Sequence, residues 1–248
     1  MYRNTFLSVM FLACCFNGSL CAQSDAQIYE RTCDAKTYPF SDPSPVATPN
    51  NSYYPYFRFD GFSMQAQEKQ WKMVVLENDY VKLTVTPEIG GKIWGAIDKV
   101  NNKEFVYTNG VVKFRDVAMR GPWTSGGIEF NFGIIGHAPT CSTPIDYLTK
   151  KNVDGSVSCH IFSYEWITRT VWNVEISLPK DKAYFTTHTT WFNQSSIDQP
   201  YYQWMNAGYA TKTGTRFYYP GTYSIGHSGD LHPYPIDEEG RDVSWYDN

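Results

Sequence analysis

The segment that decides the fold is residues 170–178, which read Thr-Val-Trp-Asn-Val-Glu-Ile-Ser-Leu. Every second residue after the initial threonine is apolar, and the intervening series contains three polar side chains. A period of two places the two series on opposite faces of a β-strand. The segment therefore predicts a half-buried strand, which a turn at Pro179–Lys182 connects to a second alternating run, Tyr184–Asn193.

The same period continues on the N-terminal side, back to Trp71. Turn residues separate the predicted strands Met73–Leu76, Val81–Val85, Lys92–Asp98 and Phe105–Thr108. Asn109-Gly110 is the strongest short hairpin signal, and Asp154-Gly155 marks a second turn of this kind. Since no segment shows a sustained helical period, we predict an all-β fold, an antiparallel β-sandwich with little helix.

The first 22 residues have the pattern of a secretory signal peptide. Arg3 supplies the positive start, Phe6–Phe16 is a short apolar region, and Leu20-Cys21-Ala22 has the form of a cleavage site. The apolar region is too short to span a bilayer as a helix. We therefore expect an exported soluble protein, periplasmic or at the cell surface, with no membrane span. A lipoprotein is the less favoured alternative.

The remaining chain divides into two parts. Residues 23–70 are rich in Pro and Tyr, and the prolines argue against a regular helix or central strand, so we expect an extended segment lying along the domain. Residues 71–248 form the predicted sandwich. The chain stops at Trp245–Asn248 without a closing strand, and from this we expect the sandwich to be incomplete at its C-terminus.

Composition narrows the range of partners. Without Arg3 the chain has 20 basic and 25 acidic residues, a net charge of −5, which argues against a nucleic-acid ligand. Aromatic residues make up 17% of the chain, which suits both strand-rich cores and carbohydrate-stacking surfaces. No nucleotide-binding or metal-binding motif is present, so no cofactor is expected. Three cysteines remain, Cys33, Cys141 and Cys159, and the sequence does not choose a disulfide pair among them.

The best candidate site is residues 120–137, Arg-Gly-Pro-Trp-Thr-Ser-Gly-Gly-Ile-Glu-Phe-Asn-Phe-Gly-Ile-Ile-Gly-His. Gly126 and Gly127 allow another backbone or a ligand to approach closely. In a strand after them, Glu129 and Asn131 share one face, roughly 7 Å apart. A carboxylate and an amide among glycines and aromatic residues can hydrogen-bond the hydroxyls of a sugar.

We assign roles to these residues as hypotheses. Glu129 would act as base or nucleophile and His137 as acid, while Arg120, Trp123 and Asn131 would bind the ligand. Glu129 could instead form a structural ion pair with Arg120 or Arg115. The other candidate ligand-binding residues are Trp204, Asn206, Tyr223, His227 and Asp230.

Several motifs resemble a bacterial family catalogued as a domain of unknown function, DUF5107. They are Pro87–Ile93, Gly121–Asn131, Pro200–Ala207 and Tyr219–His227, with Pro235-Ile236-Asp237 and Trp245-Tyr246 further along. That family is similar to the galactose mutarotase-like supersandwich, the fold of aldose 1-epimerases and of domains in glycan-degrading enzymes. Its members are common in exported proteins of gut Bacteroidetes, and many carry tetratricopeptide repeats.

The resemblance implies a carbohydrate ligand, but not a particular reaction. The late acid–base region and the Asn-Arg and His motif of aldose epimerases are not recognisable here, which argues against mutarotase activity. We therefore expect an exported carbohydrate-active domain that binds a glycan or monosaccharide. It would process its ligand by hydrolysis or epimerisation, or else be a non-catalytic glycan-binding or scaffolding module. The sequence leaves the choice, the sugar and the oligomeric state open.

Overall fold

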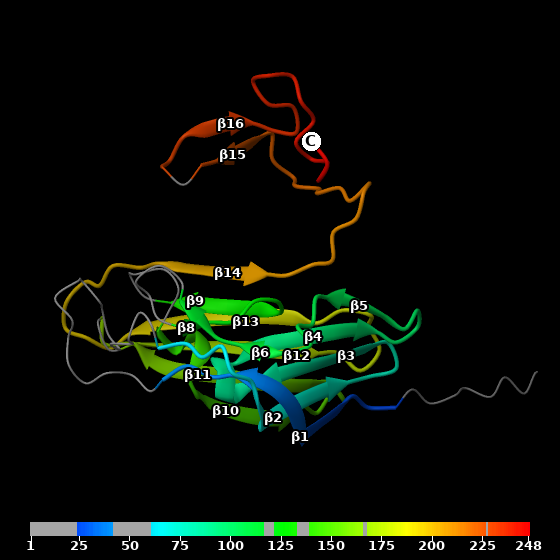
Figure 1. Cartoon of the computed structure of the whole chain (residues 1–248), viewed down its shortest axis with the longest axis vertical. Helices are drawn as coiled ribbons and strands as arrows, with labels where there is room; N and C mark the ends of the chain where they lie inside the picture. The colour runs from blue at the N-terminus through cyan, green and yellow to red at the C-terminus, as the bar shows by residue number, and fades with distance from the viewer. Residues whose placement is uncertain (1–23, 42–60, 117–121, 133–138, 166–167, 227) are drawn as a thin grey trace, which may run out of the picture.

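The computed structural model describes residues 24–41, 61–116, 122–132, 139–165, 168–226 and 228–248. Within them, two mainly antiparallel sheets face each other (Figure 1), which confirms the predicted all-β sandwich. The large sheet has the strand order β14-β9-β4-β3-β2-β1-β6, with β5 paired to β4, and the small sheet has the order β10-β11-β12-β13.

The strands of the large sheet are β1 (Gln27–Tyr38), β2 (Gln67–Glu77), β3 (Val81–Thr86), β4 (Lys92–Asp98), β5 (Lys103–Val106), β6 (Val112–Lys113), β9 (Ile128–Phe132) and β14 (Gln203–Ala207). Those of the small sheet are β10 (Asp146–Lys151), β11 (Val157–Glu165), β12 (Thr170–Leu178) and β13 (Thr186–Asn193). The remaining elements are two short hairpins and two 3-10 helices: β7 (Arg115–Asp116), β8 (Pro122–Trp123), β15 (Tyr223–Ile225), β16 (Leu231–Pro233), η1 (Pro87–Ile89) and η2 (Pro139–Ser142).

The hydrophobic core lies between the two sheets, and β12 shows how the sequence builds it. Its residues alternate strictly between buried and partly exposed, as the pattern of residues 170–178 predicts. Trp172 stacks on Phe132 of the large sheet with ring centroids 4.4 Å apart. Burial of such large side chains supplies most of the stabilisation that holds the two sheets together.

Asn78 joins the sheets at one end. Its side-chain oxygen accepts hydrogen bonds from the backbone N–H groups of Tyr80 and Val81, which closes the predicted turn between β2 and β3. Its side-chain nitrogen donates to the carbonyls of Pro179 and Lys182, in the turn between β12 and β13. One buried amide therefore satisfies backbone groups in both sheets.

Two details differ from the sequence-based expectations. Asn109-Gly110 does not close a hairpin, because the strand after it, β6, pairs in parallel with β1. Residues 27–38 form a long strand that pairs with β2 from Gln27 to Thr37, within the segment expected to lie extended along the domain. The prolines that argue against a strand all follow Tyr38.

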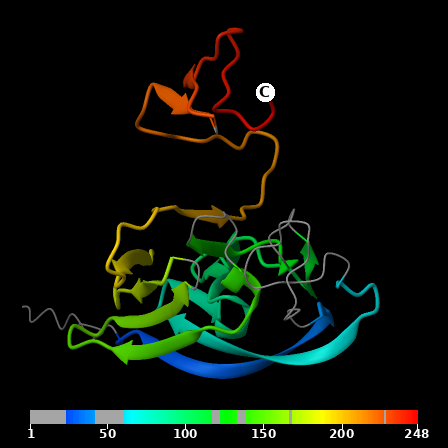
Figure 2. The ribbon, with the colours of Figure 1, turned by 90° about the vertical axis from the view of Figure 1, so that its left-hand side faces the viewer.

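The C-terminal hairpin of β15 and β16 stands apart from both sheets, as the two perpendicular views show (Figures 1 and 2). Among the described residues there is no helix long and apolar enough to cross a membrane. The three cysteines Cys33, Cys141 and Cys159 are all free thiols.

Candidate functional site

The candidate site lies on the outer face of the large sheet, the face directed away from the small sheet. Ile93 of β4 pairs with Ile128 of β9, which brings the adjacent Lys92 and Glu129 together on that face. Asn206 of β14 stands opposite Glu129 on the other side. Neighbouring strands therefore place a lysine, a glutamate and an asparagine in one row across the sheet.

Lys92 and Glu129 form a buried ion pair. Lys92 Nζ lies 3.8 Å from Glu129 Oε2, and the two side chains are 1% and 2% exposed. Asn131 Nδ2 donates a hydrogen bond of 2.9 Å to Glu129 Oε1. Charges removed from water need such partners, because an isolated buried charge is strongly destabilising.

Thr124 completes the surroundings of the Lys92 ammonium. Lys92 Nζ donates to the backbone oxygen of Thr124 and, at 3.0 Å, to its hydroxyl. Burial lowers the pKa of Lys92, and the negative charge of Glu129 opposes that shift. Lys92 is not among the site residues predicted from the sequence, whereas Arg115 is one of the two predicted alternative partners of Glu129. The guanidinium of Arg115 lies over the Phe62 ring, 4.3 Å from the centroid.

Two tryptophans border this network. Trp204 stands opposite Asn131 in the pairing of β14 with β9. Trp123 follows Pro122 in β8, and its ring centroid lies 5.8 Å from Lys92 Nζ. Both indoles are half-buried, as is Asn206, whereas Lys92 and Glu129 are fully buried. The site therefore consists of a buried charged pair with amphipathic, partly exposed side chains around it.

A thiol lies close to the ion pair. Cys141 of η2 is buried, and its Sγ donates to the carbonyl of Pro122 at 3.5 Å. Burial raises the pKa of this thiol far above its ordinary value; the charge of Glu129 adds to the shift and that of Lys92 opposes it. A raised pKa makes a thiol a weaker nucleophile at neutral pH, so the burial of Cys141 favours a packing role.

The two glycines before β9 permit a close approach of backbone segments. Gly126 and Gly127 have φ values of 75° and 66°, and a Cβ atom on Gly127 would lie 2.3 Å from the carbonyl oxygen of Ile93. Backbone hydrogen bonds then join Gly127 to Tyr107, Tyr107 to Gly208 and Gly208 to Gly127. A three-segment junction of this kind tolerates only glycine where φ is positive and the neighbouring backbone is near.

The predicted site residues therefore fall into three groups. Glu129, Asn131, Trp204 and Asn206 come together on the outer face, with Trp123 beside them. Tyr223 is in β15 and Asp230 immediately precedes β16, so both belong to the hairpin that stands apart (Figure 1). Arg120, His137 and His227 lie outside the described residues.

The described part of the chain contains no cluster of three His, Cys, Asp or Glu side chains able to hold a metal ion.

Lys92 and Thr124 are the members of the site that were not predicted from the sequence. The available signal was a lysine at the start of a largely apolar strand, directly after Gly90-Gly91. Only the pairing of β4 with β9 identifies its partner.

The fold and the site define a two-sheet antiparallel β-sandwich domain with a buried ionic network on the outer face of its large sheet. The chain belongs to the DUF5107 family, a domain of unknown function, whose family model matches residues 48–248.

A solved structure supports the fold. It is that of a TPR-domain containing protein from Parabacteroides distasonis, with 26% sequence identity and a TM-score of 0.68. The match covers 75% of the present chain and 32% of that protein, so the chain spans about a third of its length.

Proposed function

We propose that this chain is an exported domain that binds a carbohydrate on the outer face of the large sheet. The observation that carries the proposal is the arrangement of half-buried Trp123, Trp204 and Asn206 around the buried Lys92–Glu129 pair. A sugar ring offers an apolar face that stacks on an indole and hydroxyl groups that hydrogen-bond amides and charged groups. The likeness of the family to mutarotase-like domains favours the same ligand class.

The buried network suits a binding site because it is held in place before any ligand arrives. Glu129 is fixed by Asn131 on one oxygen and faces Lys92 with the other. Lys92 is fixed in turn by the backbone and side chain of Thr124. Groups fixed in this way lose little conformational freedom when a ligand binds, and this favours affinity.

The same burial favours binding over catalysis. A general base must come within hydrogen-bond reach of the proton that it removes, roughly 2.6–3.2 Å. The Glu129 carboxylate is 2% exposed and already engaged by Asn131 and Lys92. Its role in the proposal is to hold the site in shape and to set its charge.

A second candidate function, processing of the bound sugar, has one observation in its favour. Burial lowers the pKa of Lys92 directly beside Glu129, and perturbed ionisable pairs cluster at catalytic sites. In that version Glu129 is the base or nucleophile, and the acid is His137, which lies outside the described residues.

The test is a screen of glycans and monosaccharides by thermal shift on the purified protein, with product analysis of every hit. Trp204→Ala removes one wall of the site, and we expect it to weaken binding of a stabilising sugar about fivefold or more. Trp245→Ala is the matched control, because Trp245 is also partly exposed but lies near the C-terminus against Arg216.

The outcomes separate the two functions. A sugar that stabilises the protein and is recovered unchanged, with binding lost in Trp204→Ala but not in Trp245→Ala, supports the binding domain. Conversion of the sugar, abolished by Glu129→Gln with binding retained, supports the enzyme. Stabilisation by no sugar at all rejects the carbohydrate proposal.

A further inference from the structure

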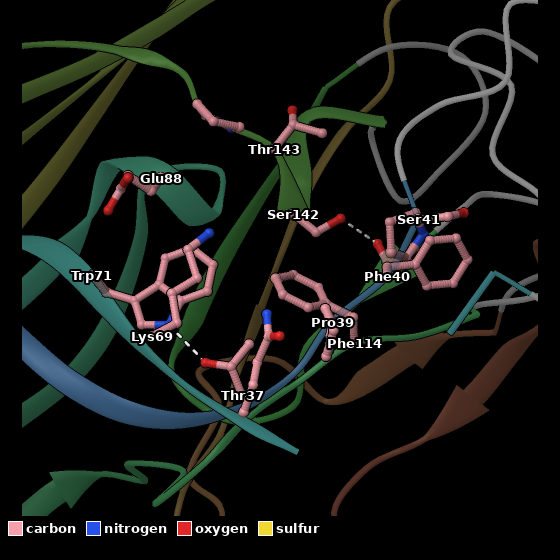
Figure 3. Close-up of a pocket in the computed structure, with 13 residues that line it drawn as sticks. Thr37, Pro39, Phe40, Ser41, Lys69, Trp71, Glu88, Phe114, Ser142 and Thr143 are labelled. Atoms are coloured by element: carbon pink, nitrogen blue, oxygen red, sulfur yellow. Dashed lines mark hydrogen bonds between the residues drawn. The ribbon is translucent and has the colours of Figure 1, made fainter. Parts of the chain in front are cut away.

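A pocket opens on the outer face of the large sheet, beyond the residues of the candidate site. Its volume is about 240 Å³, and the residues that line it include Thr37, Gln67, Lys69, Trp71, Glu88 and Phe114. Figure 3 shows labelled side chains converging on it from β1, β2 and the η2 region. The volume is below the roughly 300–1,000 Å³ of sites for drug-sized ligands, so the pocket suits a single ring-sized group.

The base of this pocket is rigid and aromatic. Trp71 and Phe114 have ring centroids 6.1 Å apart, and Trp71 Nε1 donates a hydrogen bond of 2.9 Å to the hydroxyl of buried Thr37. Lys69 Nζ lies 3.8 Å from the centroid of the Trp71 ring. These contacts hold the two buried rings, which are 3% and 6% exposed, beneath the polar groups of the pocket.

The polar groups around the pocket balance in charge. Lys69 brings a positive charge and Glu88 a negative one, while Gln67 contributes an amide and Thr143 a hydroxyl. Glu88 Oε2 also accepts the backbone N–H of Lys72 at 2.5 Å, which holds the carboxylate near the sheet. Balanced charges with amide and hydroxyl groups beside aromatic rings suit a neutral polyhydroxylated ring better than an anion or a cation.

The pocket adjoins the candidate site through β8. Pro122 lines the pocket, and the next residue, Trp123, lies beside Lys92 in the site. Ser142 Oγ donates to the Pro122 carbonyl at 2.6 Å, and this bond attaches β8 to η2. The pocket and the candidate site therefore share the short strand β8, which a hydrogen bond from η2 holds in place.

We infer that this pocket is a second sugar subsite, so that the ligand of the outer face is a neutral oligosaccharide that reaches both positions. The inference rests on the proposed function, because the first subsite is the candidate site itself. It adds a substrate class, a chain of at least two neutral sugar units, that a single site would not require.

The experiment is calorimetric titration of the purified protein with neutral mono-, di- and trisaccharides of glucose, galactose and mannose. The double variant Gln67→Ala/Lys69→Met removes the amide and the cation, and the methionine keeps an apolar chain over Trp71. Gln70→Ala is the matched control, because Gln70 is an exposed glutamine in the same strand, β2, that points to the opposite face.

We expect the wild type to bind a di- or trisaccharide at least about tenfold more tightly than the corresponding monosaccharide. In the double variant this gain is lost while monosaccharide affinity is unchanged, and Gln70→Ala behaves as the wild type. Trp204→Ala weakens both classes of ligand.

Two results overturn the inference and leave the proposed function intact. One is an oligosaccharide that binds no more tightly than its monosaccharide while Trp204→Ala still weakens binding. The other is a gain that persists in Gln67→Ala/Lys69→Met. Binding of none of the probes to the wild type would overturn both the subsite and the proposed function.

Discussion

Strands β12 and β9 each lie second from an edge of their sheet, but their outer faces differ. In β12 the outward residues remain partly exposed, whereas all five residues of β9 are buried. The outward Glu175 of β12 accepts a hydrogen bond from Ser158 near water, while the outward Glu129 of β9 is enclosed with Lys92. An alternating strand therefore guarantees one apolar face, and the chain segments around it decide whether the other face meets water.

The largest losses of unfolding free energy are expected for substitutions on the inner faces, where β9 and β12 are alike. Phe130→Ala in β9 and Trp172→Ala in β12 each remove a large buried ring, so each should lower the free energy of unfolding by about 3–5 kcal/mol. Urea denaturation followed by circular dichroism measures both. If one of the two costs less than about 1 kcal/mol, the inner faces are not equivalent.

Substitutions on the outer faces of the two strands should differ strongly in their cost to the free energy of unfolding. Lys92→Met leaves the Glu129 charge buried without its lysine, and we expect a loss of about 3–5 kcal/mol. Glu175→Gln is the comparison, and its expected cost is about 0.5–1.5 kcal/mol. Urea unfolding of Lys92→Met/Glu129→Leu is the control, because replacing both charges should recover most of the loss. Equal costs for Lys92→Met and Glu175→Gln would contradict the distinction between the two faces.

A smaller effect is expected from pH at Glu77, at the water-accessible end of β2. Burial tends to raise the pKa of this carboxyl, but hydrogen bonds from Lys99 and Tyr29 and the charge of Lys82 hold it below its ordinary value of 4.5. A lowered folded-state pKa means that the stabilisation is complete above pH 4.5 and is lost as the pH falls through the folded-state pKa.

The measurement is the difference in unfolding free energy between the wild type and Glu77→Gln as a function of pH. That difference should be constant from pH 7 down to about 5 and then shrink on further acidification. A difference that grows on acidification would contradict the lowered pKa.

The smallest perturbation is labelling of the free thiols in the folded protein. Burial raises the pKa of Cys159 to about 12 and also raises that of Cys141, whereas Cys33 is partly exposed on β1. Iodoacetamide followed by peptide mass mapping should therefore modify Cys33 first and the other two only after unfolding. Early labelling of Cys141 would show that the structure around the Lys92–Glu129 pair opens readily.

Much of the fold was predictable because its signals are local. The bounds of β4 match the predicted Lys92–Asp98, and Asp154-Gly155 lies in the turn between β10 and β11, where Gly155 has a φ of 81°. The hairpin predicted at Asn109-Gly110 was wrong, because a dipeptide indicates only a local preference for a turn. It does not indicate which strand the following segment will pair with. The parallel contact of β6 with β1 is long-range.

The site was predictable only in part, for the same reason. Period two places Glu129 and Asn131 on one face of β9, as the structure confirms through their hydrogen bond. The partner of Glu129 depends on the register between β4 and β9, which no local pattern encodes. Burial of the outer face was also hidden, since the polar residues of β9 resemble those of a solvated strand.

The row Lys92–Glu129–Asn206 has a consequence for how the protein is made. Its members come from strands far apart in the chain, and β14, which lies at one edge of the large sheet, is also the last strand of that sheet in sequence. Contacts between such distant residues are slow to form, because the entropy cost of closing a long loop comes before the contacts stabilise the structure. The ion pair can therefore form only after β4 and β9 have paired, and the row is complete only once β14, the last strand of the sheet in sequence, has joined β9.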